Sequence, residues 1–236
     1  MITAFYTGSA GAISQEQGMD ITANNLSNVS STGYKSDKAE FADLVTTSLR
    51  DQQNGAAKVM LGHGARLSKT DTVFEQGDFN QTGRAQDYAL TQSNTFFAVR
   101  ASDGTVRYTR DGNFQLSTRP DGSFLLSTAD GDSVLDGNGN PIVVRNAEAK
   151  QNIGVYSFVN LSGLNKAGNN RYEATELSGK PTSVSNDRIK EGYLEASTVD
   201  VAREMTDMIN INRAFDLNAN IIKMSDEVMQ TINSLR

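Results

Sequence analysis

The stretch Ala23–Lys35 reads ANNLSNVSSTGYK and is rich in residues that end helices and form turns. Asn and Gly readily adopt the left-handed conformation that ends a helix, and Ser and Thr side chains bond to nearby backbone groups. One such residue would be enough to stop a helix, but three Asn stand within the five residues Asn24–Asn28. The stretch therefore predicts an ordered turn at the end of a helix, with amide side chains bonding across a packed contact.

The residues before this turn predict a helix that packs lengthwise on another helix. Apolar and small residues recur there at alternating spacings of three and four, which is typical of such packing. The predicted stripe comprises Ile2, Phe5, Ser9, Ala12, Glu16, Met19, Ala23 and Leu26. Gly8, Gly11 and Gly18 interrupt the segment, and each lowers helix stability by about 1 kcal/mol relative to Ala. We expect this helix to be weak in isolation.

The other end of the chain predicts the longest helix, because neither Pro nor Gly occurs from Glu195 to Arg236. Ser197 and Asp200 have the spacing of a capping box, which places the expected start of the helix near Ser197. The apolar stripe of this helix comprises Val201, Met205, Met208, Ile211, Phe215, Ile222, Met229 and Ile232.

A second apolar face on the same helix bears on how the helix is buried. An ordinary antiparallel helix pair would explain the main stripe. It would leave a further set of large side chains in water, namely Ile209, Leu217, Ile221 and Val228. This second face favours contacts with neighbouring copies of the same chain.

The middle of the chain predicts β-structure. Asp-Gly, a strong hairpin-turn signal, recurs at Asp103, Asp111, Asp121, Asp130 and Asp136. The short apolar runs between these turns suggest an antiparallel sandwich or an irregular barrel, and no helical period interrupts them. The expected fold class is therefore α+β, with N- and C-terminal helices pairing into a coiled-coil-like domain and a central, mainly antiparallel β domain.

The composition excludes several functional classes. Hydrophobic residues make up 37% of the 236 residues, aromatic residues 7%, and Trp is absent, so we expect part of the chain to fold only against partners. A net charge of -6 without a basic cluster argues against nucleic-acid binding. The absence of Cys excludes disulfides and thiolate metal sites. Neither a secretory signal peptide nor a membrane span is expected, because no basic n-region or long apolar run occurs.

Catalysis is not expected, and neither is a cofactor. His63 is the only histidine and lies in a Gly-rich loop without candidate partners for a metal site or a triad. The segment Asp136–Asn140 begins like a calcium loop, but Pro141 and Ala147 occupy the positions that require Gly and Glu. We expect a simple turn there. Nucleotide-binding and nucleophile-elbow motifs do not occur.

Three stretches in the right order resemble the flagellar rod, hook and basal-body family. Ala23–Lys35 is similar to the family pattern A-N-N-[LI]-[AS]-N-x-x-T-x-G-[YF]-[KR], with Ser30–Thr32 stretching to fit the spacing. The stretch Gly192–Phe215 resembles the family's closing helix. The third likeness, to the family's β domain, lies in Gln76-Gly77, Thr82-Gly83, Asp87–Leu90, Phe96-Phe97 and Tyr108–Phe114. The chain departs from the family at Gln92–Thr95, where glycines usually precede the Phe pair.

The resemblance implies a structural subunit of the bacterial flagellar rod, the drive shaft, which self-assembles through its terminal helices and transmits torque from motor to hook. Its implied partners are other copies of itself, other flagellar axial proteins and the flagellar type III export apparatus. The implied location is the extracytoplasmic rod of the basal body. The resemblance also implies a division into residues 1–35 and 187–236 of an inner tube domain, a connecting segment 36–75, and a β-rich outer domain 76–186.

The residues expected at subunit contacts follow from the two stripes and the Asn-rich turn. They are Phe5, Met19, Asn24, Asn25, Leu26, Asn28, Met205, Met208, Ile211, Phe215, Ile222, Met229 and Ile232. Two alternatives stay open at this point. A hook or hook-junction-type axial protein would share the same terminal helices, whereas a secreted β-domain binding module would carry a concave site with clustered polar groups.

Overall fold

The computed structural model describes residues 2–44, 46–49, 59–119, 122–144, 151–185 and 188–235. These residues form two compact units. The first consists of Met1–Ser27, Asp37–Asp71 and Asp200–Arg236, and the second consists of Asn28–Ser36 and Thr72–Val199. We call them the helical unit and the β unit. The chain crosses between them several times, so neither unit is one continuous segment.

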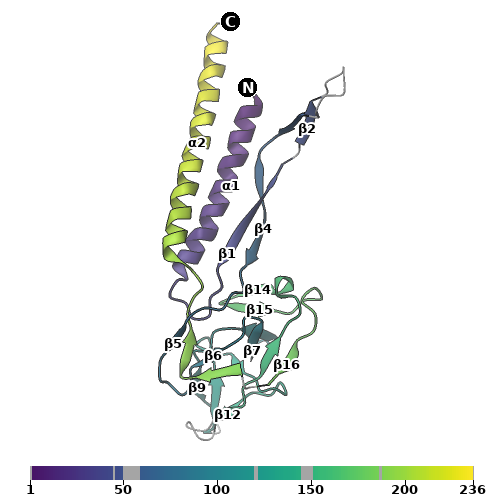
Figure 1. The fold of residues 1–236 in the computed structure, drawn as a ribbon, viewed down its shortest axis with the longest axis vertical. Helices are drawn as coiled ribbons and strands as arrows, with labels where there is room; N and C mark the ends of the chain where they lie inside the picture. The colour runs from purple at the N-terminus through teal and green to yellow at the C-terminus, as the bar shows by residue number, and fades with distance from the viewer. Residues whose placement is uncertain are drawn as a thin grey trace. The chain divides into compact units, whose positions relative to one another are not determined.

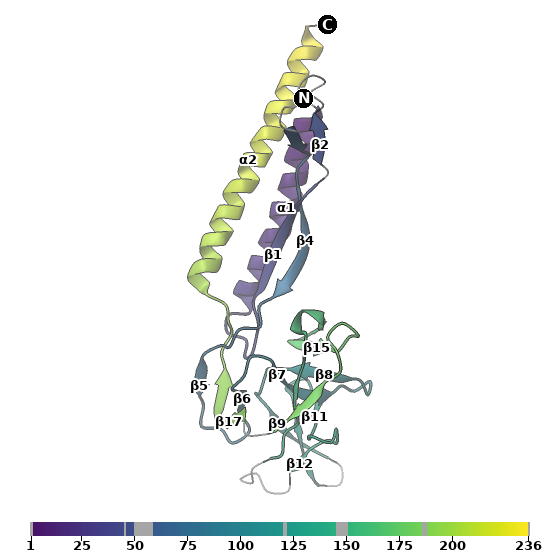
Figure 2. The same cartoon turned by 45° about the vertical axis from the view of Figure 1, so that its right-hand side comes forward.

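The helical unit contains both long helices, α1 (Ile2–Ser27) and α2 (Val201–Ser234), which lie side by side in Figures 1 and 2. A β-ribbon runs along α1, made of β1 (Asp37–Asp43) and β4 (Ala65–Thr72). A second antiparallel pair comprises β2 (Thr46–Leu49) and β3 (Val59–Gly62). The ribbon is fastened to α1 by Ser14, whose Oγ donates a hydrogen bond of 2.7 Å to the carbonyl of Ala65.

Helix α2 begins later than the capping-box spacing predicts. Asp200 is the N-cap, and its carboxylate accepts hydrogen bonds from the backbone N–H groups of Ala202 and Arg203. The prediction of a start near Ser197 is therefore wrong, because Asp200 alone satisfies the exposed amides of the first turn. The Oγ of Ser197 instead accepts a hydrogen bond of 3.3 Å from the N–H of Val199.

The predicted end of α1 is confirmed. The helix ends at Ser27, and the turn that follows is closed by a 3.1 Å hydrogen bond from the N–H of Ser31 to the carbonyl of Asn28. Gly33 has a φ of +63°, which side chains rarely tolerate. A Cβ on Gly33 would also lie 2.6 Å from the carbonyl carbon and oxygen of Arg110. The Gly of the ANNLSNVSSTGYK stretch is thus needed both for the turn and for this close approach.

The β unit is built on a ten-stranded sheet with antiparallel pairing. The main path runs in the order β12-β10-β11-β7-β8-β15-β14, β13 joins β7 to β16, and β9 pairs with β10. The strands are β7 (Thr95–Arg100), β8 (Val106–Thr109), β9 (Gln115–Thr118), β10 (Phe124–Ser127), β11 (Ser133–Val134), β12 (Val143–Val144), β13 (Val155–Ser157), β14 (Asn165–Gly168), β15 (Arg171–Glu173) and β16 (Thr182–Val184). A short 3-10 helix, Leu161–Gly163, precedes β14.

Strand β7 is the centre of this unit because both of its faces are buried. Phe97 and Val99 belong to one hydrophobic cluster, and Phe96 and Ala98 belong to another. Successive side chains of a strand point to opposite faces, so a run with no polar face is what a strand covered on both sides requires. The predicted α+β class, with terminal helices and a central antiparallel β domain, is confirmed.

Two further strand pairs close the β unit with residues from near its C-terminal end. Strand β17 (Ile189–Glu191) pairs with β6 (Tyr88–Leu90), and β18 (Tyr193–Glu195) pairs with β5 (Phe79–Gln81). Residues 189–195 therefore belong to the β unit, and the helical unit resumes at Asp200.

The Asp-Gly signals are mostly turns, as predicted. The turn at Asp103 joins β7 to β8, and the turn at Asp130 joins β10 to β11. At Asp136, the carboxylate accepts hydrogen bonds from the N–H groups of Asn138 and Asn140, which confirms the predicted turn. Asp121 lies outside the described residues.

The hairpin expected at Asp111 is wrong, since the strands on either side of it, β8 and β9, pair with other strands. A Cβ at Gly112 would overlap the carbonyl of Tyr88, so this glycine serves a close backbone approach.

Candidate assembly surface and its buried anchor

Helices α1 and α2 meet along a line of glycines. A Cβ at Gly8 would lie 3.3 Å from Cγ1 of Ile222, one at Gly11 would lie 2.9 Å from Nδ2 of Asn218, and one at Gly18 would lie 3.7 Å from Cδ1 of Ile211. Residue numbers rise along α1 as they fall along α2, so the helices are antiparallel. The main stripe predicted for α2 thus includes residues that do face α1.

The stripe predicted for α1 is offset from the face that meets α2. The predicted positions include Ser9, Ala12 and Met19, whereas the residues in contact, Gly8, Gly11 and Gly18, come one position earlier. One position is about 100° of rotation on a helix with 3.6 residues per turn. The prediction of this face is therefore wrong. It followed the apolar residues, but close approach of the two backbones depends on the small ones.

Asn25 closes the same contact at the opposite end of α1. Its Nδ2 donates to the carbonyl of Asp37 at 2.8 Å and to Oε1 of Glu204 at 3.0 Å, and its Oδ1 accepts from the N–H of Asp37 at 2.9 Å. Its side chain is buried, with 1% exposed. Burial raises the pKa of Glu204, and the hydrogen bond from Asn25 opposes this shift. Asn25 thereby ties α1 to β1 and to the first turn of α2.

The helix pair leaves much of its apolar surface in contact with solvent. Helix α2 contains no buried residue over its described side chains. Its exposed large apolar residues are Val201, Met205, Ile209, Phe215, Leu217, Ile221, Met224, Val228, Met229 and Ile232, and those of α1 include Phe5, Tyr6 and Ile13. We call this set of exposed side chains the assembly surface.

The residues predicted at subunit contacts fall into three classes of exposure. Exposed are Phe5, Asn24, Met205, Phe215, Met229 and Ile232. Partly buried are Met19, Leu26, Asn28, Met208, Ile211 and Ile222. Asn25 alone among these predicted residues is buried, and Asn28 belongs to the β unit. The structure thus places Ile211 and Ile222 at the intrachain contact, whereas the first class is exposed to solvent.

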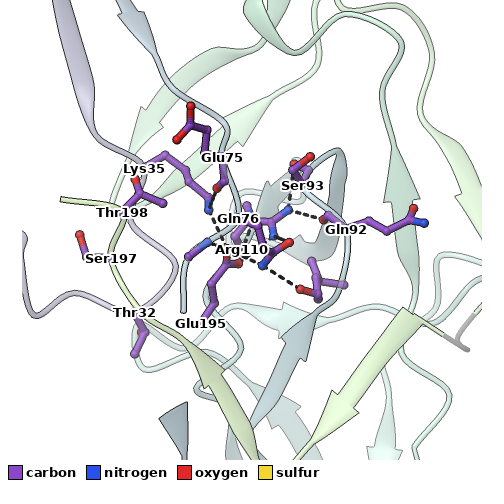
Figure 3. Close-up of polar contacts among 12 residues, drawn as sticks. Thr32, Lys35, Glu75, Gln76, Gln92, Ser93, Arg110, Glu195, Ser197 and Thr198 are labelled. Atoms are coloured by element: carbon purple, nitrogen blue, oxygen red, sulfur yellow. Dashed lines mark hydrogen bonds and ion pairs between the residues drawn. The ribbon is translucent and has the colours of Figure 1, made fainter. Parts of the chain in front are cut away.

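The β unit contains a buried ionic cluster in which Glu195 lies between two cations (Figure 3). Oε1 of Glu195 accepts hydrogen bonds from Nζ of Lys35 at 2.6 Å, Nε2 of Gln76 at 2.8 Å and the N–H of Gly77 at 2.9 Å. Oε2 accepts from Nε of Arg110 at 2.9 Å. We call Lys35, Arg110 and Glu195 the buried anchor.

The remaining donors of the anchor bind backbone carbonyls and one side chain, since Nη2 of Arg110 donates to Oε1 of Gln76 at 3.2 Å. Nη1 of Arg110 donates to the carbonyls of Gln92, Ser93 and Thr95 at 2.9, 3.0 and 2.7 Å, and Nζ of Lys35 donates to the carbonyl of Glu75. The stretch that departs from the family pattern, Gln92–Thr95, therefore supplies three acceptors to one guanidinium group.

The anchor carries two positive charges against one negative charge, and its side chains are fully buried. Burial lowers the pKa of Lys35, the charge of Arg110 lowers it further, and Glu195 opposes both effects. Burial also lowers the pKa of Arg110. Such a cluster is stable only while all of its members keep their partners.

The anchor joins three separate chain segments of the β unit. The N–H of Gly33 donates to the carbonyl of Glu195 at 2.8 Å, and the N–H of Thr198 donates to the carbonyl of Tyr34 at 3.1 Å. The N–H of Val73 donates to the carbonyl of Ser36 at 2.9 Å. The segments that lead from α1, from β4 and to α2 therefore lie together.

The amino-acid sequence by itself assigns no role to the three residues of the anchor. Lys35, Arg110 and Glu195 each stand inside a stretch that resembles the family, in Gly-Tyr-Lys, Thr-Arg-Asp-Gly and Leu-Glu-Ala. One feature of the sequence could have pointed to the anchor: each of these stretches carries one of the three charged residues, two positive and one negative, among apolar residues or glycines. Nothing local in the sequence says that the three meet.

The structure provides little for chemistry on a ligand. Over the part of the chain that is described, no three His, Cys, Asp or Glu side chains come together as a metal site would need. Within the same described residues, neither helix has a stretch apolar and long enough to cross a membrane.

Comparisons with known proteins agree with these features. Three family models match the chain: Flagella basal body rod protein over residues 5–35, Flagellar hook protein FlgE/F/G D1 domain over residues 91–158, and Flagellar basal body rod FlgEFG protein C-terminal over residues 190–235. The first covers α1 and its turn, the second most of the β sheet, and the third the closing strands with α2.

Whole-length relatives give the same result. The chain is 32% identical over 263 residues to the flagellar basal-body rod protein FlgG of Buchnera aphidicola subsp. Baizongia pistaciae, with all of both chains covered. It is 31% identical to FlgG of Borreliella burgdorferi, covering 100% of this chain and 99% of the relative, and 30% identical to FlgG of Bacillus subtilis, covering all of both. This chain therefore belongs to the flagellar basal-body rod protein family.

Proposed function

We propose that the chain is a structural subunit of the flagellar rod, which assembles with copies of itself through α1 and α2 and transmits torque from motor to hook. The observation that carries this proposal is the assembly surface. A helix of 34 residues keeps none of its described side chains buried, although many of them are large and apolar. A neighbouring subunit is the simplest source of the missing cover.

Such cover would contribute free energy to assembly. Burying what remains exposed of the four aliphatic side chains of the second face, Ile209, Leu217, Ile221 and Val228, would contribute at most about 1.5–3 kcal/mol each before ordering costs, because each is already partly covered. The cost of ordering loosely held helices opposes this gain. We infer that the helix pair is only partly stable in the free subunit and becomes rigid when neighbours pack on it.

The remaining parts of the proposal follow from family membership. Other axial proteins of the flagellum would bind at the two ends of a stack of these subunits. The type III export apparatus would deliver the chain to the extracytoplasmic rod. The expected division gave residues 1–35 and 187–236 to the inner tube, 76–186 to the outer wall and 36–75 to the connection. With the units of the structure, the helical unit would form the inner tube and the β unit, which includes Asn28–Ser36 and residues up to Val199, the outer wall. The protein would carry no catalytic activity of its own.

The test places a charge on the assembly surface. Phe215→Asp should stop incorporation into basal bodies and abolish swimming in a strain that lacks its own copy of the protein. In the purified full-length variant, the thermal unfolding of the β unit should stay unchanged. Asn212→Asp is the matched control, because Asn212 is exposed on the same helix and is already polar. Deletion of residues 1–30 should also prevent incorporation. Normal incorporation of Phe215→Asp would show that this face is not an assembly surface.

A further inference from the structure

Two of the three glycines of α1 have a larger residue of α2 as their nearest neighbour. Gly8 opposes Ile222 and Gly11 opposes Asn218, whereas a Cβ at Gly18 would lie 3.2 Å from Cζ of Phe41 in β1 and 3.7 Å from Cδ1 of Ile211. Three glycines in one helix lower its intrinsic stability by about 1 kcal/mol each relative to Ala. This loss of helix stability requires a compensating contact. The positions of the glycines indicate that the contact is the close packing of α1 on α2.

The contact at Gly11 is the tightest of the three. A Cβ there would lie 2.9 Å from Nδ2, 3.0 Å from Oδ1 and 3.1 Å from Cγ of Asn218, so the amide group occupies the space that any other side chain would need. At Gly8 the backbone carbonyl of Asn218 would lie 3.5 Å from a Cβ. The backbones are therefore closest where Asn218 sits above the two glycines.

The three contacts together are met in only one alignment of the helices. Sliding α1 by three residues would bring Gly8 under Asn218, but Ile222 would then meet Phe5 in place of a glycine. A slide in the other direction would put Ser14 under Asn218, where a Cβ is present. A polar residue at such a seam position is known to select one register of a helix pair at some cost in stability.

We propose that Asn218, seated on Gly11, sets the register of α1 against α2, with the pair Gly8–Ile222 reinforcing it. The hydrogen bond between Asn25 and Glu204 at 3.0 Å belongs to the same alignment. The register decides which apolar side chains of the two helices stand next to each other on the assembly surface. That last step rests on the proposed function, whereas the register itself concerns the chain alone.

A swap of the two residues tests the register. Gly11→Asn places two amides opposite each other, and Asn218→Gly leaves two glycines opposite each other, so each single variant should lose the selected alignment. The double variant restores one amide facing one glycine and should recover it. Helix propensity alone predicts no recovery, because in that case the two effects simply add.

The register can be read from disulfide formation, since the chain contains no Cys. Gln15 and Ala214 lie between the contacts at Gly11 and Gly18, both are partly buried, and helical spacing places them opposite each other. The reporter is the full-length chain carrying Gln15→Cys and Ala214→Cys, treated with an oxidant. The control pair, Gln15→Cys with Met208→Cys, is displaced by six residues, about 9 Å along the axis at 1.5 Å per residue.

The expected result is preferential cross-linking of the reporter pair over the control pair, a loss of about tenfold in that preference in each single variant, and recovery in the double variant. Equal yields of the two pairs in the otherwise native chain would overturn the proposal, and so would a double variant no better than the worse single one. Incorporation into basal bodies, measured on the same variants without the cysteines, separates the two proposals. If the single variants lose the cross-linking preference and the double variant recovers it, but all of them are incorporated equally well, the link between register and assembly is contradicted. The proposal about the register itself would still stand.

Discussion

The carboxylate of Glu195 lies 2.6 Å from the ammonium group of Lys35, and neither side chain is exposed to solvent. The same carboxylate is 2.8 Å from Nη2 of Arg110, which is also fully buried. The two cations therefore share one counter-charge. Because Glu195 comes from the last strand of the β unit, the balance of charge within that unit depends on a residue that is distant in sequence from both cations.

Glu195→Gln should destabilise the β unit by about 3–5 kcal/mol, because it leaves two buried cations without a counter-charge. The measurement is denaturant unfolding followed by tyrosine fluorescence, since the chain has seven Tyr and no Trp. Glu173→Gln is the matched control. Its carboxylate is 2.9 Å from Nε of Arg107, but its side chain is 39% exposed, so its loss should cost about 1 kcal/mol or less. Equal losses in the two variants would show that burial of the anchor does not decide its strength.

Lys35→Met should cost less than Glu195→Gln. It removes one of the two cations and leaves Glu195 paired with Arg110, so the buried cluster becomes neutral. The unbranched thioether side chain of Met fills most of the space of the Lys side chain. The same unfolding measurement on both variants checks the order. A larger loss for Lys35→Met would mean that its hydrogen bonds outweigh the excess charge.

Asp111→Asn should change how the stability of the β unit depends on pH. Burial raises the pKa of Asp111 above 3.8, while hydrogen bonds from Thr32 and the N–H of Asn113 oppose the shift. The folded state thus holds this proton more tightly than the unfolded state does. The resulting stabilisation is complete below pH 3.8 and is lost as the pH rises through the raised pKa. Asp111→Asn should remove that loss, so the variant gains stability relative to the native chain as the pH rises.

Asp103→Asn is the control for this pH measurement, because the pKa of Asp103 is shifted in the opposite direction to that of Asp111. Hydrogen bonds from Thr105 lower the pKa of Asp103 below 3.8, so its stabilisation is present above pH 3.8 and is lost as the pH falls through the lowered value. Urea unfolding at a series of pH values should show the two differences from the native chain changing in opposite directions. Parallel changes would contradict the environment assigned to Asp111.

Gly33→Ala should destabilise the chain more than Gly104→Ala does. Gly33 and Gly104 both have positive φ values, +63° and +85°, so an alanine at either position costs about 1–2 kcal/mol in backbone strain. Only at Gly33 would the new Cβ also press on the backbone of Arg110, at 2.6 Å, whereas at Gly104 nothing lies within 4 Å. The difference between the two variants in denaturant unfolding measures the overlap alone. Equal losses would show that the turn relaxes away from Arg110.

Features that depend on neighbouring residues were predicted from the sequence, and features that depend on distant ones were not. The end of α1 at Ser27, the long α2 and most Asp-Gly turns follow from capping, periodicity and turn chemistry, which act over a few residues. The hairpin expected at Asp111 failed because Gly112 serves a contact with the carbonyl of Tyr88, a relationship between two strands. The ribbon of β1 and β4 along α1 was treated as a mere connection for the same reason.

In the candidate site, too, the part that is marked by nearby residues was predicted, and the part that depends on residues distant in sequence was not. The stripe of α2 was predicted because large apolar residues mark it, and Ile211 and Ile222 do face α1. The matching face of α1 was missed because its buried residues are glycines and small polar residues, which carry no apolar period. The anchor of Lys35, Arg110 and Glu195 unites residues up to 160 positions apart, and each is an ordinary charged residue in its own surroundings.

Amide hydrogen exchange on the unassembled chain should show weak protection in α1 and α2 and strong protection in β7. Local stability follows the amount of buried apolar surface around a segment. Strand β7 is buried on both faces, whereas α2 has no buried residue among its described side chains and packs against α1 at Gly8 and Gly11, where little apolar surface is available. Assembly should raise the protection of both helices and leave that of β7 unchanged, because neighbours would cover only the helix surface. If both helices were as strongly protected as β7 in the free chain, the helix pair would already be rigid, and the ordering of helices by neighbouring subunits would be contradicted.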